Sequence, residues 1–336
     1  MTDGICILAN DVVYDQLIAL LNSLEVNAGK AYPVLVIPYD ERTAQVEQLI
    51  EQRPNVELFK ETAIISRWEK FAEQIWQRHP TAYQKWTQRG IQGVNRLGMH
   101  RRFCGFDGPF DRFLYLDADI LVLGALAPLF EQLEQGDISV YDFQYKDLSH
   151  VFDVTSAKLT QVFETSKLSR DIFCAGLYAS KQGLFDRGRR DWLLEQLDQD
   201  AEILYTNGPD QSILNYMMLK TGLTVCNLAQ QPPAETRTGC CITSPHFEQR
   251  DYRLYDRGQP LTYLHYIGLS SQYFRRLCQG ENLTFPYRDL FLHYRYLQDP
   301  AAQPVFSGHS QQCPPRPPGL GQKILKKLRL MPARRA

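Results

Sequence analysis

The sequence has no excess of charge of either sign, no long hydrophobic run and no regular cysteine pattern. Its 336 residues include 37 Lys and Arg against 38 Asp and Glu, and this balance argues against a protein that binds nucleic acid through bulk electrostatics. No stretch of about 18 apolar residues occurs, so we expect no segment that spans a membrane. The eight cysteines show no CxxC spacing, which favours a reducing, cytoplasmic location over a disulfide-stapled secreted domain.

Two further absences narrow the class of protein. No positively charged region precedes the first apolar run, Ile5 to Ala9, so we do not expect a signal peptide. No internal repeat is visible. What is present, 44% hydrophobic and 12% aromatic residues, excludes a disordered or fibrous chain and is enough for a sizeable core.

The charge is unevenly distributed along the chain. Residues 320–336 contain six basic residues and no acidic one, so the rest has 31 basic against 38 acidic residues, a net charge of −7. We expect a folded domain at 1–300, a Pro-rich linker at 301–322 and a basic tail at 323–336. Two interpretations of the tail stay open, a short amphipathic helix that contacts an anionic membrane surface and a solubilising end.

The first 60 residues alternate between strand and helix patterns. Apolar runs at 4–10, 33–38 and 56–59 are separated by segments with helical spacing. This alternation is typical of the α/β class, with a mainly parallel sheet flanked by helices. Residues 66–104 are expected to be largely helical with a break at Pro80, and their tryptophans to serve in packing.

The strongest motif follows a buried-strand pattern at 113–116. Asp117 and Asp119 come at the carboxyl end of this strand, and a second apolar run at 120–123 follows. Ligands bind at that edge of open α/β sheets, and paired carboxylates suit Mn²⁺ or Mg²⁺ together with a diphosphate. The alternative is a polar loop in which an Asp caps the next helix; the apolar runs on both sides favour the metal site.

The segment Tyr115-Leu-Asp-Ala-Asp-Ile-Leu-Val resembles the signature of retaining nucleotide-sugar glycosyltransferases of the GT-A fold, in the family-8 group that includes glycogenin and galactinol synthase. Four further segments occur in that family's order and approximate spacing. They are Ala9-Asn-Asp with Tyr14, His100-Arg-Arg-Phe, Asn207-Gly-Pro-Asp-Gln through Asn215, and His265-Tyr-Ile-Gly. The resemblance implies a single Rossmann-like domain with a mixed, mainly parallel sheet.

The resemblance also implies roles for individual residues. Asp117, Asp119 and His265 would bind Mn²⁺ or Mg²⁺, and Asp210 and Gln211 would lie near the anomeric carbon of the sugar. Asp210 also fits a simpler interpretation as the N-cap of a helix. The residues expected to bind the nucleotide sugar are Ala9, Asn10, Tyr14, Arg101, Arg102, Ala118, Cys174, Gly176, Gly268, Ser271 and Arg275.

Three details of the phosphate and sugar contacts stay open. One of Arg101 and Arg102 is expected to hold a phosphate, and the resemblance slightly favours Arg101. Cys174 stands where the family has an Asn that contacts the sugar, and a thiol is a poorer hydrogen-bonding group. Ser271 stands where the family places a Lys for the diphosphate, so Arg275 or Arg276 would have to supply that charge.

Together these features predict a metal-dependent hexosyltransferase that uses a nucleotide sugar, expected to be UDP-linked, with retention. One alternative is a non-catalytic module that binds a nucleotide or glycan. A sugar-phosphate nucleotidyltransferase is disfavoured, because residues 10–14 contain neither Gly nor Lys to grip a triphosphate. The acceptor, whether a glycan, a lipid-linked sugar or a small molecule, has no readable signature; a nucleic acid partner is not expected.

Overall fold

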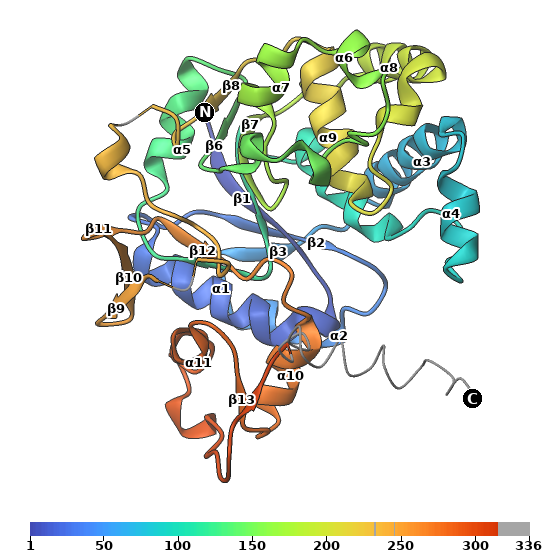
Figure 1. Ribbon diagram of the computed structural model, residues 1–336. Coiled ribbons are helices and arrows are strands. Elements are labelled where there is room, and N and C mark those ends of the chain that lie inside the picture. The colour runs from blue at the N-terminus through green and yellow to red at the C-terminus, as the bar shows by residue number, and fades with distance from the viewer. Residues whose placement is uncertain (232, 245, 315–336) are drawn as a thin grey trace, which may run out of the picture.

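The computed structural model describes residues 1–231, 233–244 and 246–314 and is built around one seven-stranded sheet (Figure 1). The strand order is β3-β2-β1-β4-β7-β6-β8, and only β7 runs antiparallel to its neighbours. This mixed, mainly parallel sheet confirms the predicted fold class. The sheet strands are β1 Asp3–Ala9, β2 Val34–Pro38, β3 Val56–Leu58, β4 Arg112–Asp117, β6 Ile138–Val140, β7 Leu177–Lys181 and β8 Val225–Asn227.

The central strands are continuous apolar runs because both faces of the sheet are covered by helices. Along β1, Ile5 and Ile7 belong to one hydrophobic core, and Cys6 and Leu8 belong to the other. The helices are α1 Tyr14–Asn27, α2 Ala44–Glu51, α3 Thr62–Arg78, α4 Ala82–Gln88, α5 Ala127–Glu131, α6 Leu159–Val162, α7 Thr165–Asp171, α8 Arg187–Asp200, α9 Pro209–Lys220, α10 Ser271–Cys278 and α11 Arg288–Arg295.

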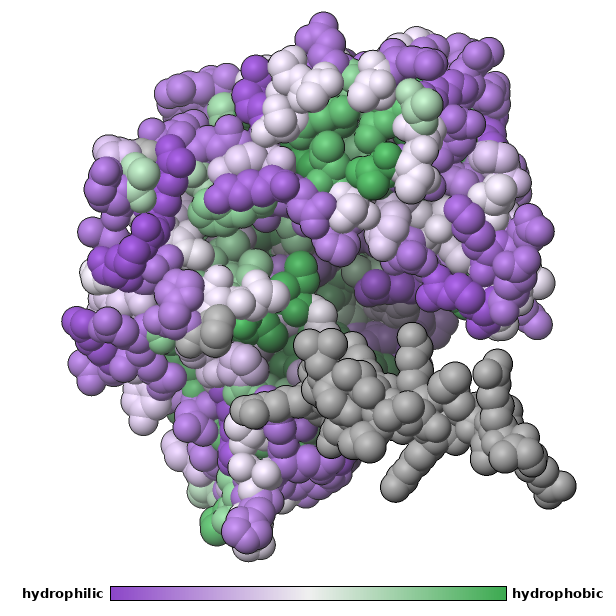
Figure 2. All heavy atoms as spheres, in the orientation of Figure 1, coloured by the Kyte–Doolittle hydropathy of each residue, from purple (hydrophilic) through white to green (hydrophobic). Residues whose placement is uncertain are grey.

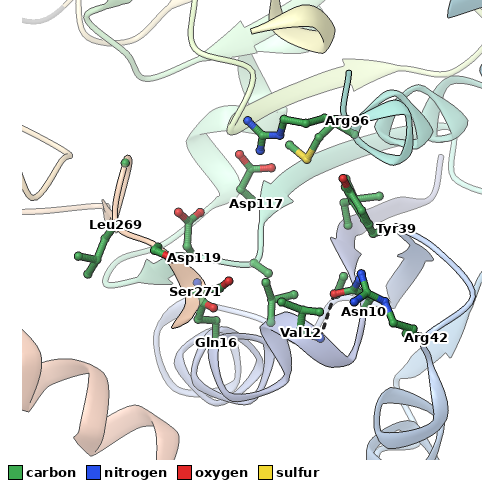
Figure 3. A pocket seen from close by; sticks show the side chains of 17 residues that line it. Asn10, Val12, Gln16, Tyr39, Arg42, Arg96, Asp117, Asp119, Leu269 and Ser271 are labelled. Carbon is green, nitrogen blue, oxygen red and sulfur yellow. Dashed lines mark hydrogen bonds between the residues drawn. The ribbon is translucent and has the colours of Figure 1, made fainter. Parts of the chain in front are cut away.

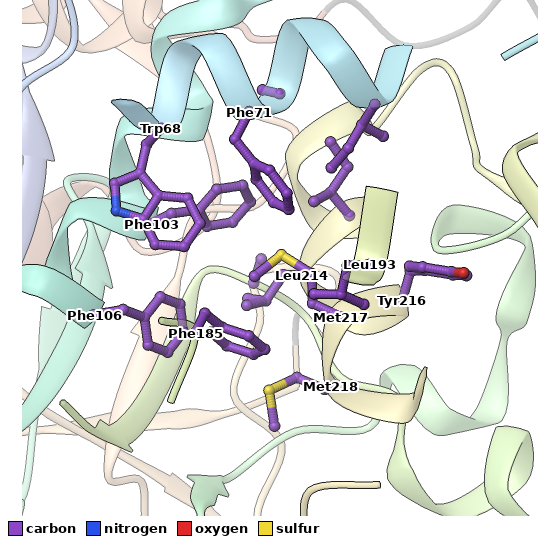
Figure 4. Packing of buried hydrophobic residues seen from close by; sticks show 14 of the residues in the cluster. Trp68, Phe71, Phe103, Phe106, Phe185, Leu193, Leu214, Tyr216, Met217 and Met218 are labelled. Atoms are coloured by element: carbon purple, nitrogen blue, oxygen red, sulfur yellow. The ribbon is translucent and has the colours of Figure 1, made fainter. Parts of the chain in front are cut away.

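The two faces of the sheet carry different sets of helices. Helices α1, α2 and α5 contribute to the core on one face, and α3, α4, α8 and α9 contribute to the core on the other. Trp68, Trp76 and Trp86 of the second set are fully buried, which confirms their predicted packing role. Figure 4 shows Trp68 and Phe71 of α3 directed toward Leu214 and Met217 of α9.

A third layer forms around α1 from the C-terminal part of the chain. The short strand β5 (Ile120–Val122) pairs antiparallel with β12 (Tyr263–His265), and α10 and α11 pack against α1. Charged and polar side chains cover most of the face seen in Figure 2, while apolar ones gather in its upper part and its central hollow. The remaining strands are β9 Glu248–Arg250, β10 Arg253–Asp256, β11 Gln259–Pro260, β13 Leu283–Thr284 and β14 Gln311–Gln312.

The folded body extends further than the predicted boundary near residue 300. Strand β14 pairs with β13, and the side chain of Cys313 is buried in a third hydrophobic core, to which β5, β12, α10 and α11 contribute. The first part of the predicted linker at 301–322 is therefore packed on the domain, because an added strand and a buried thiol hold it there. The rest of that linker and the basic tail at 323–336 lie outside the described residues.

The structure bears on two features that the sequence lacks, a disulfide pattern and a membrane-spanning segment. All eight cysteines are unbridged, including the adjacent Cys240 and Cys241. Among the residues the structure describes, no helix combines the length and apolar character needed to cross a membrane.

Candidate active site

A cavity of about 610 Å³ opens at the carboxyl edge of β1 and β4. Leu8 on β1 lies opposite Asp117 on β4, so the segments that follow these two strands lie side by side. The opposite wall comes from Gly268 to Ser271, at the start of α10. Figure 3 shows the carboxylates of Asp117 and Asp119 directed into this space. The predicted metal-binding edge is thus the floor of this cavity.

Asp117, Asp119 and His265 form a cluster whose ligand atoms all lie within 4.8 Å of one another. The pairing of β12 with β5 places His265 beside Ile120, and so beside the two acids. The Nε2 atom of His265 lies 3.2 Å from Oδ1 of Asp119 and 4.0 Å from Oδ2 of Asp117. Two carboxylates and an imidazole suit Mn²⁺ or Mg²⁺, so the residues present fit the predicted ion.

Neighbouring groups fix the orientation of Asp117. Its Oδ1 accepts hydrogen bonds from the Tyr115 hydroxyl at 2.7 Å and from Nη2 of Arg102 at 3.1 Å, so Oδ2 is the atom left near His265. The backbone carbonyl of Gly176 accepts from the amide of Asp117 at 2.8 Å. A Cβ atom at Gly176 would lie 2.5 Å from Cε1 of His265. The site therefore has no room for a side chain at this position.

The three ligands perturb one another's protonation. Burial raises the pKa of Asp117, and the charge of Arg102 only partly offsets this effect. Burial would also raise the pKa of Asp119, but the His265 charge and hydrogen bond bring it below its ordinary value. Burial alone would lower the pKa of His265, but Asp119 and then Cys174 raise it well above its ordinary value. Without a metal, a proton on His265 thus balances the acids, and a divalent cation would take its place.

Arg102 joins the metal cluster to the predicted catalytic acid. Its side chain is 1% exposed, and Nη2 lies 3.1 Å from Asp117 and 3.0 Å from Oδ2 of Asp210. Burial would raise the pKa of Asp210, but Arg102 brings it below its ordinary value, so this carboxylate is ionised. The N-cap of α9 is Gly208, and Asp210 lies in the first helical turn without a capping bond. The interpretation of Asp210 as an N-cap is therefore wrong.

Arg101 and Arg102 both direct their guanidinium groups to the protein itself. Arg101 binds Glu69 at 2.7 Å, Glu41 at 3.3 Å and the Pro38 carbonyl at 3.0 Å. Neither arginine lines the cavity. The expectation that one of them holds a phosphate thus has no geometric basis here, because their charges are already balanced by nearby acids.

Helix α9 is docked onto the chain that leads into β7. The side-chain amide of Asn215 binds both the N–H and the carbonyl of Phe173, each at 2.9 Å. Oε1 of Gln211 accepts from the amide of Ala175 at 2.9 Å, and its Nε2 donates to the His150 carbonyl at 3.0 Å. These bonds hold Gln211 beside the segment that carries Cys174, whose thiol lies near His265.

The predicted residues divide into a group at the cavity surface and a group behind it. Tyr14 packs against the core that contains Ile5 and Ile7, and Arg275 is exposed on α10 and does not line the cavity. The predicted residues that line the cavity are Ala9, Asn10, Asp117, Ala118, Asp119, Gly268 and Ser271. Those that do not are Tyr14, Arg101, Arg102, Cys174, Gly176, Asp210, Gln211, His265 and Arg275.

Several lining residues were not predicted from the sequence. Gln16, Tyr39, Arg42 and Arg96 all contribute to the wall. None of them belongs to a motif, and Arg42 and Arg96 are isolated cations in connecting segments. Asn10, which was predicted, acts first as a local cap, since its Oδ1 accepts from the amide of Val12 at 3.0 Å.

Comparisons with known proteins establish the fold. No family model matches the sequence, and no curated protein matches it. The galactosyltransferase LgtC, solved in complex with donor and acceptor sugar analogues, is similar at 16% identity and a TM-score of 0.50, covering 86% of this chain and 100% of that one. The bifunctional glycosyltransferase WbbM, in its apo form, is similar at 13% identity and a TM-score of 0.52, covering 90% of this chain and 52% of that one. The chain therefore has the fold of the GT-A glycosyltransferases.

Proposed function

We propose that this protein is a metal-dependent glycosyltransferase that moves a hexose from a UDP-sugar to an acceptor hydroxyl with retention. The observation that carries the proposal is the Asp117, Asp119 and His265 cluster, whose two acids line the floor of the cavity. In a GT-A fold, this edge of the sheet is where a nucleotide sugar would lie. The bound donor and acceptor analogues of LgtC support a cavity of this fold that takes both substrates.

The cluster would bind Mn²⁺ or Mg²⁺, which neutralises negative charge on the nucleoside diphosphate. Arg102 and Tyr115 hold one oxygen of Asp117 and so leave the other to the cation. Gly268 and Ser271 line the cavity at the start of α10, which packs on the segment at 11–13. The nucleoside would lie against that segment, and the diphosphate would lie over the two acids.

In the proposed reaction, the bond between the anomeric carbon and the terminal phosphate oxygen breaks, and the acceptor oxygen bonds to that carbon. The acceptor proton leaves with the nucleoside diphosphate. Asp210 and Gln211 begin the helix beside this region, and Asp210 is ionised. Its negative charge would stabilise the positive charge that develops on the sugar ring.

The test is to incubate the protein with a panel of nucleotide sugars and MnCl₂ and to measure the nucleoside diphosphate released. We expect release from a UDP-sugar above background, and a loss of at least about 100-fold in Asp119→Asn because a metal ligand is removed. Asp299→Asn, which changes an exposed acid far from the cluster, is the matched control and should keep full activity. Binding of a donor without release would favour the non-catalytic module, and no binding of any donor would reject the proposal.

The basic tail bears on where the protein acts in the cell. We propose a cytoplasmic enzyme whose basic tail at 323–336 contacts an anionic membrane surface, which would suit a lipid-linked or surface glycan acceptor. What supports this is the charge pattern of the tail, six basic residues and no acidic one in residues 320–336.

A further inference from the structure

The basic residues predicted to bind the diphosphate do not present a free positive charge to the cavity. Ser271 replaces the expected Lys at the start of α10. Arg275 does not line the cavity, and Arg276 is paired with Glu281 at 2.6 Å. Arg101 and Arg102 are bound to protein acids. Two carboxylate ligands already balance the charge of a divalent ion, so the negative charge of a diphosphate calls for another cation at the site.

Two arginines do line the cavity, and they differ in how much of their charge is free. Arg42 is paired with Asp40, which its Nη2 approaches to 2.5 Å. Arg96 is exposed, and within the described residues its guanidinium makes no hydrogen bond or ion pair. Figure 3 shows the Arg96 side chain on the cavity side, with its guanidinium directed toward Asp117. Arg96 thus offers an uncommitted cation to a ligand above the metal cluster.

The backbone of Arg96 has an uncommon conformation. Its φ is 55° and its ψ is 44°, in the left-handed region, at the residue that precedes the 3₁₀ helix at Leu97–Asp107. This conformation is unfavourable for a residue with a Cβ atom and persists where flanking contacts impose it. The Arg96 carbonyl accepts from the amide of Met99 at 2.8 Å. Gly98 packs so closely on Tyr39 that a Cβ there would lie 2.2 Å from the Tyr39 carbonyl oxygen.

The charges around Arg96 indicate what it would bind. The acids nearby are Asp117, Asp119 and Asp210. The buried Arg102 already forms ion pairs with Asp117 and Asp210. The charge of Arg96 also lowers the pKa of Asp210, together with larger contributions from Arg102 and His100. Arg96 therefore lines the same cavity as Asp117 and Asp119 and is near enough to Asp210 to influence its protonation.

We propose that Arg96 binds the terminal phosphate of the nucleoside diphosphate, in the role that a Lys at position 271 would otherwise fill. The inference rests on the proposed function, since it takes the ligand to be a nucleotide held by the metal cluster. A guanidinium presents two parallel N–H groups that match two phosphate oxygens, and it stays charged at all physiological pH values.

The experiment is calorimetric titration of the whole protein with UDP and with UMP in MnCl₂. UMP lacks the terminal phosphate, so the pair of ligands isolates its contact. Arg96→Ala should weaken UDP binding by about 10- to 100-fold, the range for a hydrogen bond between charged groups, and should change UMP binding by less than about 3-fold. Arg96→Lys should recover part of the loss.

Two control variants complete the design. Arg89→Ala removes an exposed guanidinium that binds Asn207 outside the cavity, and UDP binding should not change. Arg275→Ala tests the rival cation on α10 and should also leave UDP binding unchanged. Glycine adopts a positive φ without strain, so Arg96→Gly serves as a second variant should Arg96→Ala fold poorly.

The outcomes separate this inference from the proposed function. A wild-type protein that binds UDP, with Arg96→Ala equal to it, overturns the inference alone. Equal losses for UDP and UMP, or a loss in Arg275→Ala in place of Arg96→Ala, also overturn it. A wild-type protein that does not bind UDP in the presence of Mn²⁺ overturns both.

Discussion

Single residues at this site are constrained by what lies within a few ångströms of them. Gly176 has no side chain because His265 and Asp117 occupy the space where one would be. Tyr115 and Arg102 both donate hydrogen bonds to Oδ1 of Asp117. The other oxygen, Oδ2, is therefore the one near His265. Each of these residues positions a metal ligand without itself binding the ion.

Gly176→Ala should therefore weaken metal binding without unfolding the protein. The added methyl would lie 2.5 Å from Cε1 of His265, so the imidazole must move away from Asp119. We expect Mn²⁺ affinity, measured by calorimetry, to fall by about 10- to 100-fold, the effect typical of a disturbed ligand orientation. Gly188→Ala is the matched control, since its nearest atom would be 3.7 Å away. Unchanged Mn²⁺ affinity in Gly176→Ala would show that His265 is not a ligand.

At the scale of elements, the sequence predicted the strands and helices that have a clear apolar period. The alternation over residues 4–59 became β1, α1, β2, α2 and β3, because buried parallel strands are short apolar runs and amphipathic helices repeat every three to four residues. Asp117 and Asp119 were found because they end such a run. Residues without a periodic context were missed, and Arg96 is the clearest case, a lone cation in a connecting turn.

Contacts between distant elements were predictable only through resemblance to a family. His265 lies beside Asp119 because β12 pairs with β5, and no local pattern encodes that pairing. The burial of Arg102 could not be predicted from the sequence either, since a basic pair on a helix usually faces solvent. Its partners Asp117 and Asp210 come from two other elements, and only the fold brings the three together.

The contact between α3 and the 3₁₀ helix at Leu97–Asp107 depends on a neutral histidine. Nε2 of His100 accepts from the indole N–H of Trp76 at 3.2 Å, and its Nδ1 lies 3.0 Å from the Leu97 carbonyl, to which it donates in the neutral form. Burial lowers the pKa of His100 from 6.5 to about 4. The unfolded chain binds a proton as the pH falls below 6.5, and the folded chain does so only near pH 4.

His100 thus contributes stability that is complete above pH 6.5 and is lost as the pH falls to about 4, amounting to about 3 kcal/mol. Urea unfolding at pH 7 and at pH 4.5 should show a smaller difference in the free energy of unfolding for His100→Gln than for the wild type, by about 2 kcal/mol. His309→Gln, which replaces an exposed histidine, should keep the wild-type difference. A His100→Gln protein with the full wild-type pH dependence would contradict this assignment.

On the scale of the whole molecule, the C-terminal layer completes the domain. Helices α10 and α11 pack against α1, and α10 begins with residues that line the cavity. The segment that follows α11 returns to this layer, where Gln311 pairs with Leu283 and Cys313 is 1% exposed. The site and the C-terminal segment therefore belong to one folded unit.

Truncation should show where this unit ends. A chain ending at residue 314 keeps β14 and the buried Cys313, so its midpoint of urea unfolding should equal that of the full chain. A chain ending at residue 299 loses both and leaves part of the third core exposed, which should lower the free energy of unfolding by about 2 kcal/mol or more. Since α10 packs on the same core, UDP binding should weaken in the shorter chain and persist in the longer one. Equal stability of the two truncated chains would return the boundary to residue 300 and make the pairing of β13 with β14 irrelevant to the fold.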